Sequence, residues 1–223
     1  MKLAAKNEKD KSRAGRRRDR NRSFESRPPM LGFYLIVTDT DETEKHYFEG
    51  LKNSISKELK NKIIIKVEKA KTTYKMIEKT RELCGEQAQQ RIPWIVFDRD
   101  MVKDFDGIIR EAERNGINAG WSNPCIEIWL YAYFGEMPNI PDSVNCNYRF
   151  EQKYKQMTGQ SYSKNDADIY KKLIQYGDED AAIKLAERKL EQARSNHDNP
   201  SDCYPACTIH ELVKEIRLKT QKQ

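Results

Sequence analysis

Acidic side chains follow directly after two short apolar segments of this 223-residue sequence. The first apolar segment covers residues 31–38, and the second covers residues 93–97. The acids that follow them are Asp39, Asp41, Glu42, Glu44, Asp98 and Asp100. If residues 98–100 are extended, Asp98 and Asp100 lie on one side of the chain and Arg99 on the other. Clustered carboxylates can bind Mg²⁺, which takes few carboxylates and bridges phosphates, so these residues indicate metal-assisted chemistry at a phosphodiester.

Helix capping is an alternative explanation for some of these acids. Asp, Ser and Thr side chains accept hydrogen bonds from the free N–H groups at the start of a helix. Capping could account for Asp41, Thr43 or Asp104. It accounts less well for Asp98 and Asp100, because the helix that follows them is predicted to begin only at residue 105.

The elements that must position these acids alternate between strands and helices. Apolar runs without helical spacing indicate buried strands, and apolar side chains three or four residues apart indicate helices. The predicted strands are 31–38, 63–67, 93–97 and 117–121, and the predicted helices are 43–59, 72–84, 105–115 and 124–134. This alternation predicts an α/β fold with a mostly parallel sheet flanked by helices. Because ligands bind at the carboxyl ends of such strands, the acids are expected to meet there.

Composition divides the chain into three parts. Residues 1–30 contain eleven Lys or Arg and four acids, which is a charge of +7 against +6 for the whole chain. We predict a disordered basic tail over residues 1–30, because it has too few apolar residues to form a core. Such a tail could contact phosphate backbones or only increase solubility. The α/β core is predicted at 31–135 and a helical C-terminal lobe at 136–223, with a loop at 136–147 and only helices from Tyr148 onward.

Two classes of protein are excluded by the sequence. No apolar run approaches the ~18–20 residues that a membrane-spanning helix needs, and no apolar stretch follows the basic start as it does in a secretory signal. The chain has five cysteines, an odd number without dense spacing. This cysteine pattern is typical of a reducing compartment, so we expect a cytoplasmic protein without membrane contact.

Three segments in this order resemble the RloB-like family, which resembles a branch of the Toprim superfamily. The segments are Thr38–Phe48, Phe97–Asp100 and Ser122–Leu130, and the C-terminal stretch Thr208–Val213 resembles the family's closing helix. The resemblance implies a parallel α/β core of the Toprim type that binds Mg²⁺ (or Mn²⁺) and acts on phosphodiesters. It also implies a bacterial restriction or abortive-infection protein, often encoded beside an ABC- or AAA-type ATPase.

The resemblance carries over to individual residues. Asp39 stands where the family has a metal-linked Glu, Glu44 matches the second acid of that loop, and Asp98 and Asp100 match its DxD motif. Glu127 matches an acid that we place near the site. Asp39 is one methylene shorter than Glu, and Thr40 replaces the usual Gly, which permits a sharper loop. Asp41 or Glu42 could therefore take part in place of Asp39. Ser122 and Asn123 are expected to form the turn into the helix that carries Glu127.

The predicted function is a Mg²⁺-dependent nuclease that cleaves DNA or RNA, tRNA included, in bacterial defence against phage. The catalytic residues would be Asp39, Glu44, Asp98, Asp100 and Glu127. The alternative is a Toprim scaffold without catalysis that binds nucleic acid or the partner ATPase. A third hypothesis is primase-like nucleotidyl transfer. The chain could also form a homo-oligomer.

Two further groups of residues could bind ligands: a set of His and Cys residues near the C-terminus and a set of basic and aromatic residues after Gly135. His197, Cys203, Cys207 and His210 could hold Zn²⁺, although their spacing differs from that of a zinc finger, and a loop with two buried cysteines is the alternative. Basic and aromatic residues also alternate after Gly135: Tyr148, Arg149, Lys153, Tyr154, Lys155, Tyr162, Lys164, Tyr170, Lys171 and Lys172. They suit nucleic-acid binding or amphipathic packing. We expect packing for most of them and nucleic-acid contact by a few exposed cations.

Overall fold

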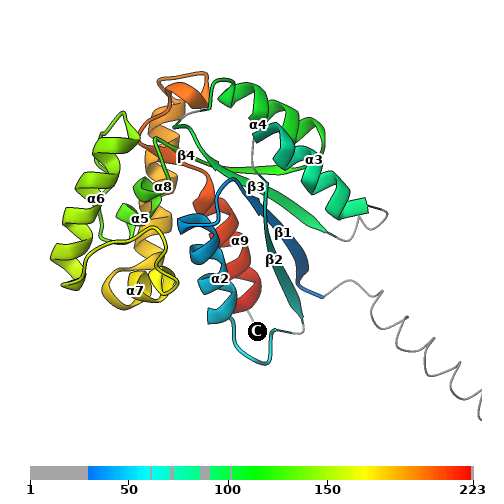
Figure 1. Cartoon of the computed structure of the whole chain (residues 1–223), viewed down its shortest axis with the longest axis horizontal. Helices are drawn as coiled ribbons and strands as arrows, with labels where there is room; N and C mark the ends of the chain where they lie inside the picture. Colours follow the sequence, from blue (N-terminus) through cyan, green and yellow to red (C-terminus); the bar gives the residue numbers. More distant parts are fainter. Residues whose placement is uncertain (1–29, 61, 71–72, 86–90, 101, 222–223) are drawn as a thin grey trace, which may run out of the picture.

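The computed structural model describes residues 30–60, 62–70, 73–85, 91–100 and 102–221 (Figure 1). The strands are β1 (Gly32–Thr38), β2 (Ile63–Lys69), β3 (Ile92–Asp98), β4 (Asn118–Asn123) and β5 (Ala206–Cys207). The first helices are α2 (Thr43–Ser54), α3 (Thr73–Cys84), α4 (Phe105–Arg114) and α5 (Glu127–Ala132). The later helices are α6 (Ser143–Thr158), α7 (Ile169–Tyr176), α8 (Glu179–Arg194) and α9 (Ile209–Gln221), with a 3-10 turn, η2, at Pro200–Asp202. The predicted basic tail, apart from Met30, lies outside the described residues.

One five-stranded sheet organises the described part of the chain, in the order β2-β1-β3-β4-β5. The first four strands are parallel, and β5 joins the edge of β4 in the antiparallel direction. The chain leaves β1 on one side to form β2 and returns on the other side to form β3. The strand order therefore reverses between β1 and β3, which is where open α/β sheets form a ligand crevice. The predicted α/β class with a mostly parallel sheet is confirmed.

Helices cover both faces of the sheet (Figure 1). Alternate strand residues point to opposite faces. Tyr34 and Ile36 of β1 belong to a buried cluster that α2, α5 and α9 complete, whereas Leu35 and Val37 belong to a second cluster that α3 and α4 complete. The strands are apolar in successive residues because both of their faces are buried.

The C-terminal region contributes to the sheet as well as to the helical lobe. The prediction of only helices after Tyr148 is wrong at β5, where Cys207 pairs with Ser122 and Ala206 with Asn123. Two apolar residues are too short a run to signal a strand by periodicity. The larger buried cluster includes side chains from both sides of residue 135, so one core crosses the predicted domain boundary.

Three predicted helix boundaries differ from the structure. The loop predicted at 136–147 ends early because Asp142 caps α6, and its side chain accepts a 2.8 Å hydrogen bond from the Asn145 N–H. Helix α2 ends at Ser54 because Ile55 is extended, although Ile55 still packs into the core. Helix α5 begins at Glu127, so Pro124 is outside its first turn. The Pro124 carbonyl instead accepts a hydrogen bond from the Asp100 N–H.

Among the described residues, no helix combines the length and the apolar character needed to cross a bilayer.

Candidate metal site at the carboxyl end of the sheet

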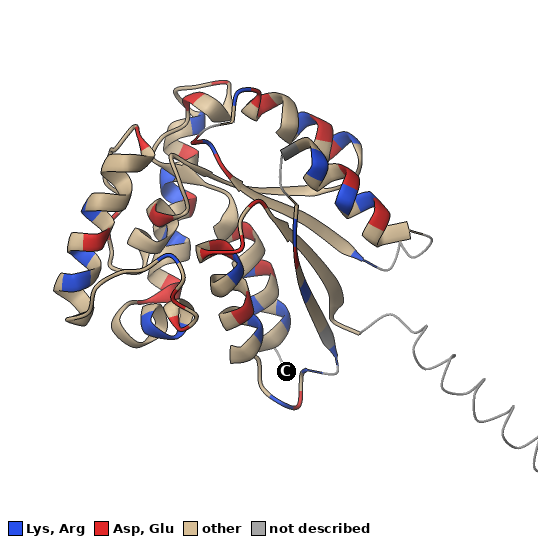
Figure 2. Cartoon of the chain, viewed as in Figure 1, with Lys and Arg blue, Asp and Glu red and all other residues tan. Residues whose placement is uncertain are grey.

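A cavity of about 180 Å³ opens at the carboxyl ends of β1 and β3, where the strand order reverses. Figure 2 shows acidic residues at the start of α2, beside this edge of the sheet. The residues that line the cavity are mostly acidic or hydroxyl-bearing: Asp39, Thr40, Glu42, Thr43, Glu44, Asp98, Asp100, Val102, Ile126 and Lys164. The cavity therefore brings together four of the five acids predicted to be catalytic, and the fifth, Glu127, lies behind it.

Asp39 and Asp98 come from neighbouring parallel strands. Asp39 follows the last residue of β1, and Asp98 is the last residue of β3. The Oδ1 atom of each is buried and has no hydrogen-bond partner among the described residues. Burial, together with the charge of Asp100, raises the pKa of Asp39 to about 6, although nearby backbone N–H groups oppose this shift. Burial and the charges of Glu44 and Asp39 raise the pKa of Asp98 well above its ordinary value. A bound cation would stabilise the ionised form of both carboxylates.

Glu44 lies in the first turn of α2 and is buried. Its Oε2 atom accepts a hydrogen bond from the Thr40 hydroxyl group, so the residue that replaces the family's Gly holds the second acid of the loop. Burial raises the pKa of Glu44 to about 7, and the charges of Asp39 and Glu127 add to the shift while the Thr40 hydrogen bond opposes it. The anionic form of Glu44 is thus disfavoured unless positive charge is nearby.

Asp100 is exposed at the mouth of the cavity, where its Oδ1 atom accepts a 2.8 Å hydrogen bond from Ser143 Oγ at the start of α6. Arg99 turns away from the cavity. Its Nη1 group donates to the Val102 carbonyl at 3.1 Å, and its guanidinium carbon lies 5.8 Å from the centre of the Phe105 ring. Asp98 and Asp100 both line the cavity and Arg99 does not, although residues 99 and 100 form a bend and a turn and not the extended chain on which the prediction depended.

Glu127 is fully buried at the start of α5 and does not line the cavity. Its Oε1 atom accepts a 2.9 Å hydrogen bond from the Tyr162 hydroxyl group, which lies 3.0 Å from Thr43 Oγ1. The Lys164 ammonium group is 3.8 Å from the same Oε1 atom. Burial is the largest single influence and lowers the pKa of Lys164, but the charges of Glu127, Glu44, Asp98 and other nearby groups together outweigh it, so the pKa is raised. Glu127 Oε2 has no partner among the described residues.

Sequence reasoning gave Tyr162 and Lys164 no part in the site. They come from the segment between α6 and α7, and their contacts with Glu127 cross more than thirty positions of the chain. No local pattern marks such a contact. The mixed basic and aromatic composition of this region was the only signal, and it pointed equally to packing. Of that group, Tyr154 is fully buried whereas Tyr148 is 63% exposed.

Ser122 and Asn123 are strand residues and do not form a helix-capping turn as expected. Ser122 pairs in register with Asp98, and its buried Oγ atom has no partner among the described residues. The Asn123 amide group donates to the carbonyls of Pro200 and Ser201 at 3.3 and 3.0 Å. The prediction failed because β4 continues two residues beyond its expected end.

The two alternative acids of the first loop differ in position. Asp41 is exposed and pairs with Lys69 at 2.6 Å and with Lys45 at 3.7 Å. The Lys69 hydrogen bond lowers the pKa of Asp41, so this carboxylate is already balanced by cations. Glu42 is exposed but lines the cavity. Glu42 is therefore better placed than Asp41 to assist Asp39.

The four residues predicted for zinc are not brought together. Cys203 packs in the cluster under α3 and α4, whereas Cys207 packs in the cluster on the other face of the sheet. His197 is exposed after α8, and His210 is buried in α9. Burial raises the pKa of Cys207 to about 12. The alternative of two buried cysteines agrees with this arrangement.

Within the described ranges, no three His, Cys, Asp or Glu side chains form a group that could hold a metal ion. A Mg²⁺ site needs only one or two carboxylates, because this ion retains several waters. The unpartnered oxygens of Asp39 and Asp98 are hard donors of the type that Mg²⁺ prefers, and their raised pKa values indicate a lack of positive charge. The donor set therefore fits a hydrated Mg²⁺ ion held by these two residues.

Comparison with models of protein families gives a match to the model described as RloB-like protein over residues 34–216, more than four fifths of the chain. Comparison with curated proteins gives no match, and comparison with solved structures gives none either. The matched region begins in β1, ends in α9 and includes every residue of the cavity. The chain therefore belongs to the RloB-like protein family.

Proposed function

We propose that this protein is a Mg²⁺-dependent nuclease that cleaves phosphodiester bonds of DNA or RNA. The observation that supports the proposal best is the pair Asp39 and Asp98. They end neighbouring parallel strands at the point where the strand order reverses, and each has a buried carboxylate oxygen without a partner. A binding site at this position is expected from the architecture of open α/β sheets.

Each residue of the cavity has a distinct role in this proposal. Asp39 and Asp98 would hold Mg²⁺ or Mn²⁺. Asp100, at the mouth of the cavity, and Glu44, in α2, would accept hydrogen bonds from the waters of the bound ion. The bound ion would supply charge stabilisation of a phosphodiester displacement. Glu127, held by Tyr162, would orient Lys164. The Lys164 ammonium group lines the cavity and would pair with a phosphate oxygen of the substrate.

Membership of the RloB-like family supports a role in bacterial defence against phage. In that role the protein would act in the cytoplasm, on DNA or on RNA such as tRNA, with an ABC- or AAA-type ATPase encoded nearby as its partner. A homo-oligomer would be compatible with either substrate.

Cleavage assays with purified protein test the proposal directly. Labelled DNA and RNA are incubated with Mg²⁺ or Mn²⁺, with and without the neighbouring ATPase. We expect cleavage that EDTA stops and that Asp98→Asn with Asp100→Asn abolishes. Asp41→Asn is the matched control, because Asp41 is an acid of the neighbouring loop after β1 that does not line the cavity, and this variant should retain cleavage. Cleavage that survives the double substitution would show that the site is assigned wrongly.

A second candidate is a binding protein without catalysis. It is favoured by the absence of any group of three acids that could hold a metal among the described residues, and by the shorter Asp39. Retained nucleic-acid or ATPase binding without cleavage under every condition would support it. Incorporation of labelled nucleotides in the same assay would instead indicate primase-like transfer.

A further inference from the structure

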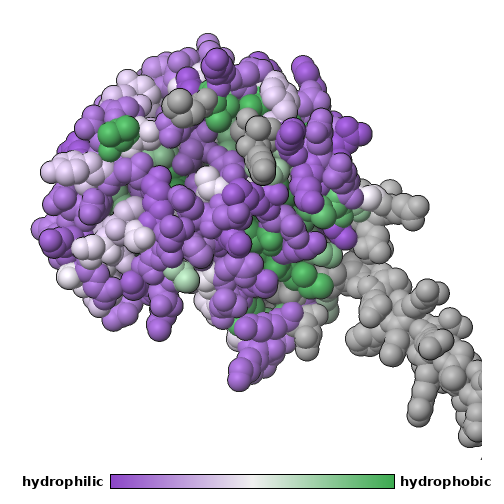
Figure 3. Space-filling view, in the orientation of Figure 1, coloured by the Kyte–Doolittle hydropathy of each residue, from purple (hydrophilic) through white to green (hydrophobic). Residues whose placement is uncertain are grey.

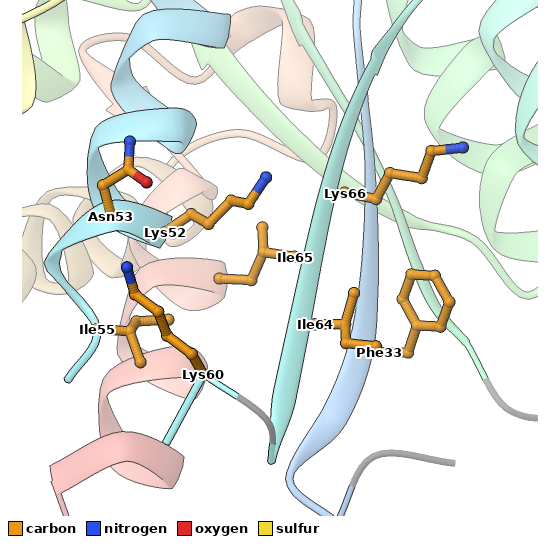
Figure 4. A pocket seen from close by; sticks show the side chains of 8 residues that line it. All are labelled: Phe33, Lys52, Asn53, Ile55, Lys60, Ile64, Ile65 and Lys66. Carbon is orange, nitrogen blue, oxygen red and sulfur yellow. The ribbon is translucent and has the colours of Figure 1, made fainter. Parts of the chain in front are cut away.

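A groove of about 390 Å³ runs along the outer edge of β2, at the end of the sheet opposite the carboxylate cavity. It is lined by Phe33, Lys52, Asn53, Ile55, Lys60, Ile64, Ile65 and Lys66 (Figure 4). Lys52 lies eight residues after Glu44 in α2, so about 12 Å along the helix axis separates the two sites. Residues of the carboxylate cavity take no part in the groove.

The groove surrounds a strand edge that no described strand covers. β2 is the outermost strand on its side of the sheet and pairs only with β1. The Lys62 carbonyl accepts a 2.7 Å hydrogen bond from the Leu31 N–H, so the Lys62 backbone faces β1. Because alternate residues of an edge strand face opposite sides, the backbones of Ile65 and Val67 face outward. An added strand could pair with these groups.

The floor of the groove is apolar. Ile64 is 43% exposed on one side of β2, whereas Ile65 points between β2 and α2 (Figure 4). The space-filling view shows hydrophobic surface over the β1–β2 region of a mostly hydrophilic face (Figure 3). Phe33 lies beside Ile64, its partner in the register of β1 and β2. These side chains can receive apolar side chains of a chain that runs along β2.

The rim of the groove is basic. Three of the eight lining residues are lysines, and none of the eight is acidic. Lys52 and Lys66 each contact one acid outside the lining, Glu49 at 3.3 Å and Glu68 at 2.9 Å. Lys60 is exposed in the segment that joins α2 to β2. A ligand with acidic side chains would complement this rim.

We propose that the β2 edge and its groove bind an extended acidic segment of a partner protein by strand addition. Alternate apolar side chains of that segment enter the groove, its carboxylates pair with Lys52, Lys60 and Lys66, and its backbone pairs with β2. The outward-facing backbone groups of β2 favour a peptide over nucleic acid, because only a peptide backbone can extend the sheet by strand pairing. A second copy of this chain is disfavoured, because two β2 edges would bring two lysine rims together.

Binding of two peptide libraries to the full chain tests this proposal. In both libraries, eight-residue capped peptides carry Val, Ile, Leu or Phe at alternate positions. The remaining positions are Asp or Glu in one library and Lys or Arg in the other. We expect only acidic peptides to be retained. N-methylation of alternate amides in a retained peptide should abolish binding, and amide exchange over residues 63–69 should slow when the unmodified peptide is added.

Charge reversal in the groove gives the matched protein variants. Lys52→Glu with Lys60→Glu should weaken binding of a retained peptide roughly tenfold, because two attractive contacts become repulsive. Lys155→Glu with Lys184→Glu changes the net charge equally at exposed positions of α6 and α8 and should leave binding unchanged. Circular dichroism checks that both variants fold.

Three results would overturn the proposal. The first is equal retention of the acidic and basic libraries, or retention of neither. The second is that an oligonucleotide binds the chain, the acidic peptides do not, and the Lys52→Glu, Lys60→Glu variant loses the oligonucleotide. The third is a dimer of the wild-type chain in sedimentation experiments that the same variant dissociates.

Discussion

The Tyr162 hydroxyl group donates a 2.9 Å hydrogen bond to Glu127 Oε1, across 35 positions of the chain. This contact joins the segment after α6 to the first residue of α5, directly behind the carboxylate cavity. It also positions Lys164, two residues further on, against the same oxygen. Among the residues that the structure describes, the C-terminal half of the chain therefore supplies the one cation that lines a cavity otherwise built around acids.

Removal of the Tyr162 hydroxyl group should destabilise the fold. Tyr162→Phe leaves the fully buried Glu127 carboxylate with one donor fewer, which should cost about 1–3 kcal/mol in the free energy of unfolding. Urea denaturation measures this loss. Tyr148→Phe is the control, because Tyr148 is 63% exposed, and its stability should change by less than about 0.5 kcal/mol. Equal stability of the two variants would contradict a structural role for the Tyr162 contact.

Added Mg²⁺ should raise the melting temperature of the wild-type chain relative to a sample in EDTA. A cation that binds only the folded state stabilises it by RT ln(1 + L/Kd), where L is the concentration of free cation. Asp98→Asn with Asp39→Asn should remove this response, since both unpartnered oxygens are replaced in the cavity. Asp41→Asn should keep it. A Mg²⁺ response that persists in the double variant would place the ion elsewhere.

The metal-free protein should lose stability as the pH rises from 5 to 8. The pKa values of Asp39 and Glu44 in the folded state are raised to about 6 and about 7. For acids with raised values, the stabilisation is complete below the ordinary pKa and is lost as the pH passes the folded-state value. The loss should be on the order of 1–3 kcal/mol. Denaturation in EDTA at several pH values measures it, and Glu44→Gln should flatten the dependence. A Glu44→Gln variant with the same pH dependence as the wild-type chain would refute the assignment of the Glu44 shift.

A partly buried ion pair between Arg217 and Glu179 should hold the C-terminal helices together. Arg217 Nε donates to Glu179 Oε1 at 2.6 Å, and the hydroxyl groups of Tyr133 and Tyr170 donate to Glu179 Oε2 at 2.9 and 2.8 Å. Arg217→Met removes the cation and its hydrogen bond from a partly buried carboxylate, which should cost about 1–3 kcal/mol. Lys214→Met breaks an exposed pair with Glu187 and should cost less than about 1 kcal/mol. Similar losses in both variants would argue against a special role for the Arg217–Glu179 pair.

Deletion of residues 1–30 should weaken nucleic-acid binding and reduce its dependence on salt. The segment carries a charge of +7, and each phosphate neutralised contributes about −0.7 to −0.9 to the slope of log K against log salt. Binding measured from 50 to 200 mM salt tests this expectation, and the Mg²⁺ response of the melting temperature should remain. If affinity and slope are both unchanged, the tail serves only solubility.

Local patterns in the sequence were enough to predict the alternation of strands and helices and the position of the acids after β1 and β3. These features depend on local periodicity, since a strand buried on both faces must be apolar in consecutive residues. Asp39, Asp98 and Asp100 could be placed at one edge because parallel strands end together there. The start of helix α5 and the end of strand β4 lie two or three residues later than predicted, because the Pro124 carbonyl accepts a hydrogen bond from the Asp100 N–H and not from a helix residue.

The contacts between side chains that are distant in sequence depend on tertiary packing and could not be predicted from the sequence pattern. Tyr162 and Lys164 reach Glu127, Ser122 lies beside Asp98, and β5 joins the sheet through the pairing of Cys207 with Ser122. Cys203 and Cys207 are four residues apart and still pack on opposite faces of the sheet. Each of these outcomes follows from the packing of segments that are remote in sequence, and residue spacing carries no information about such contacts.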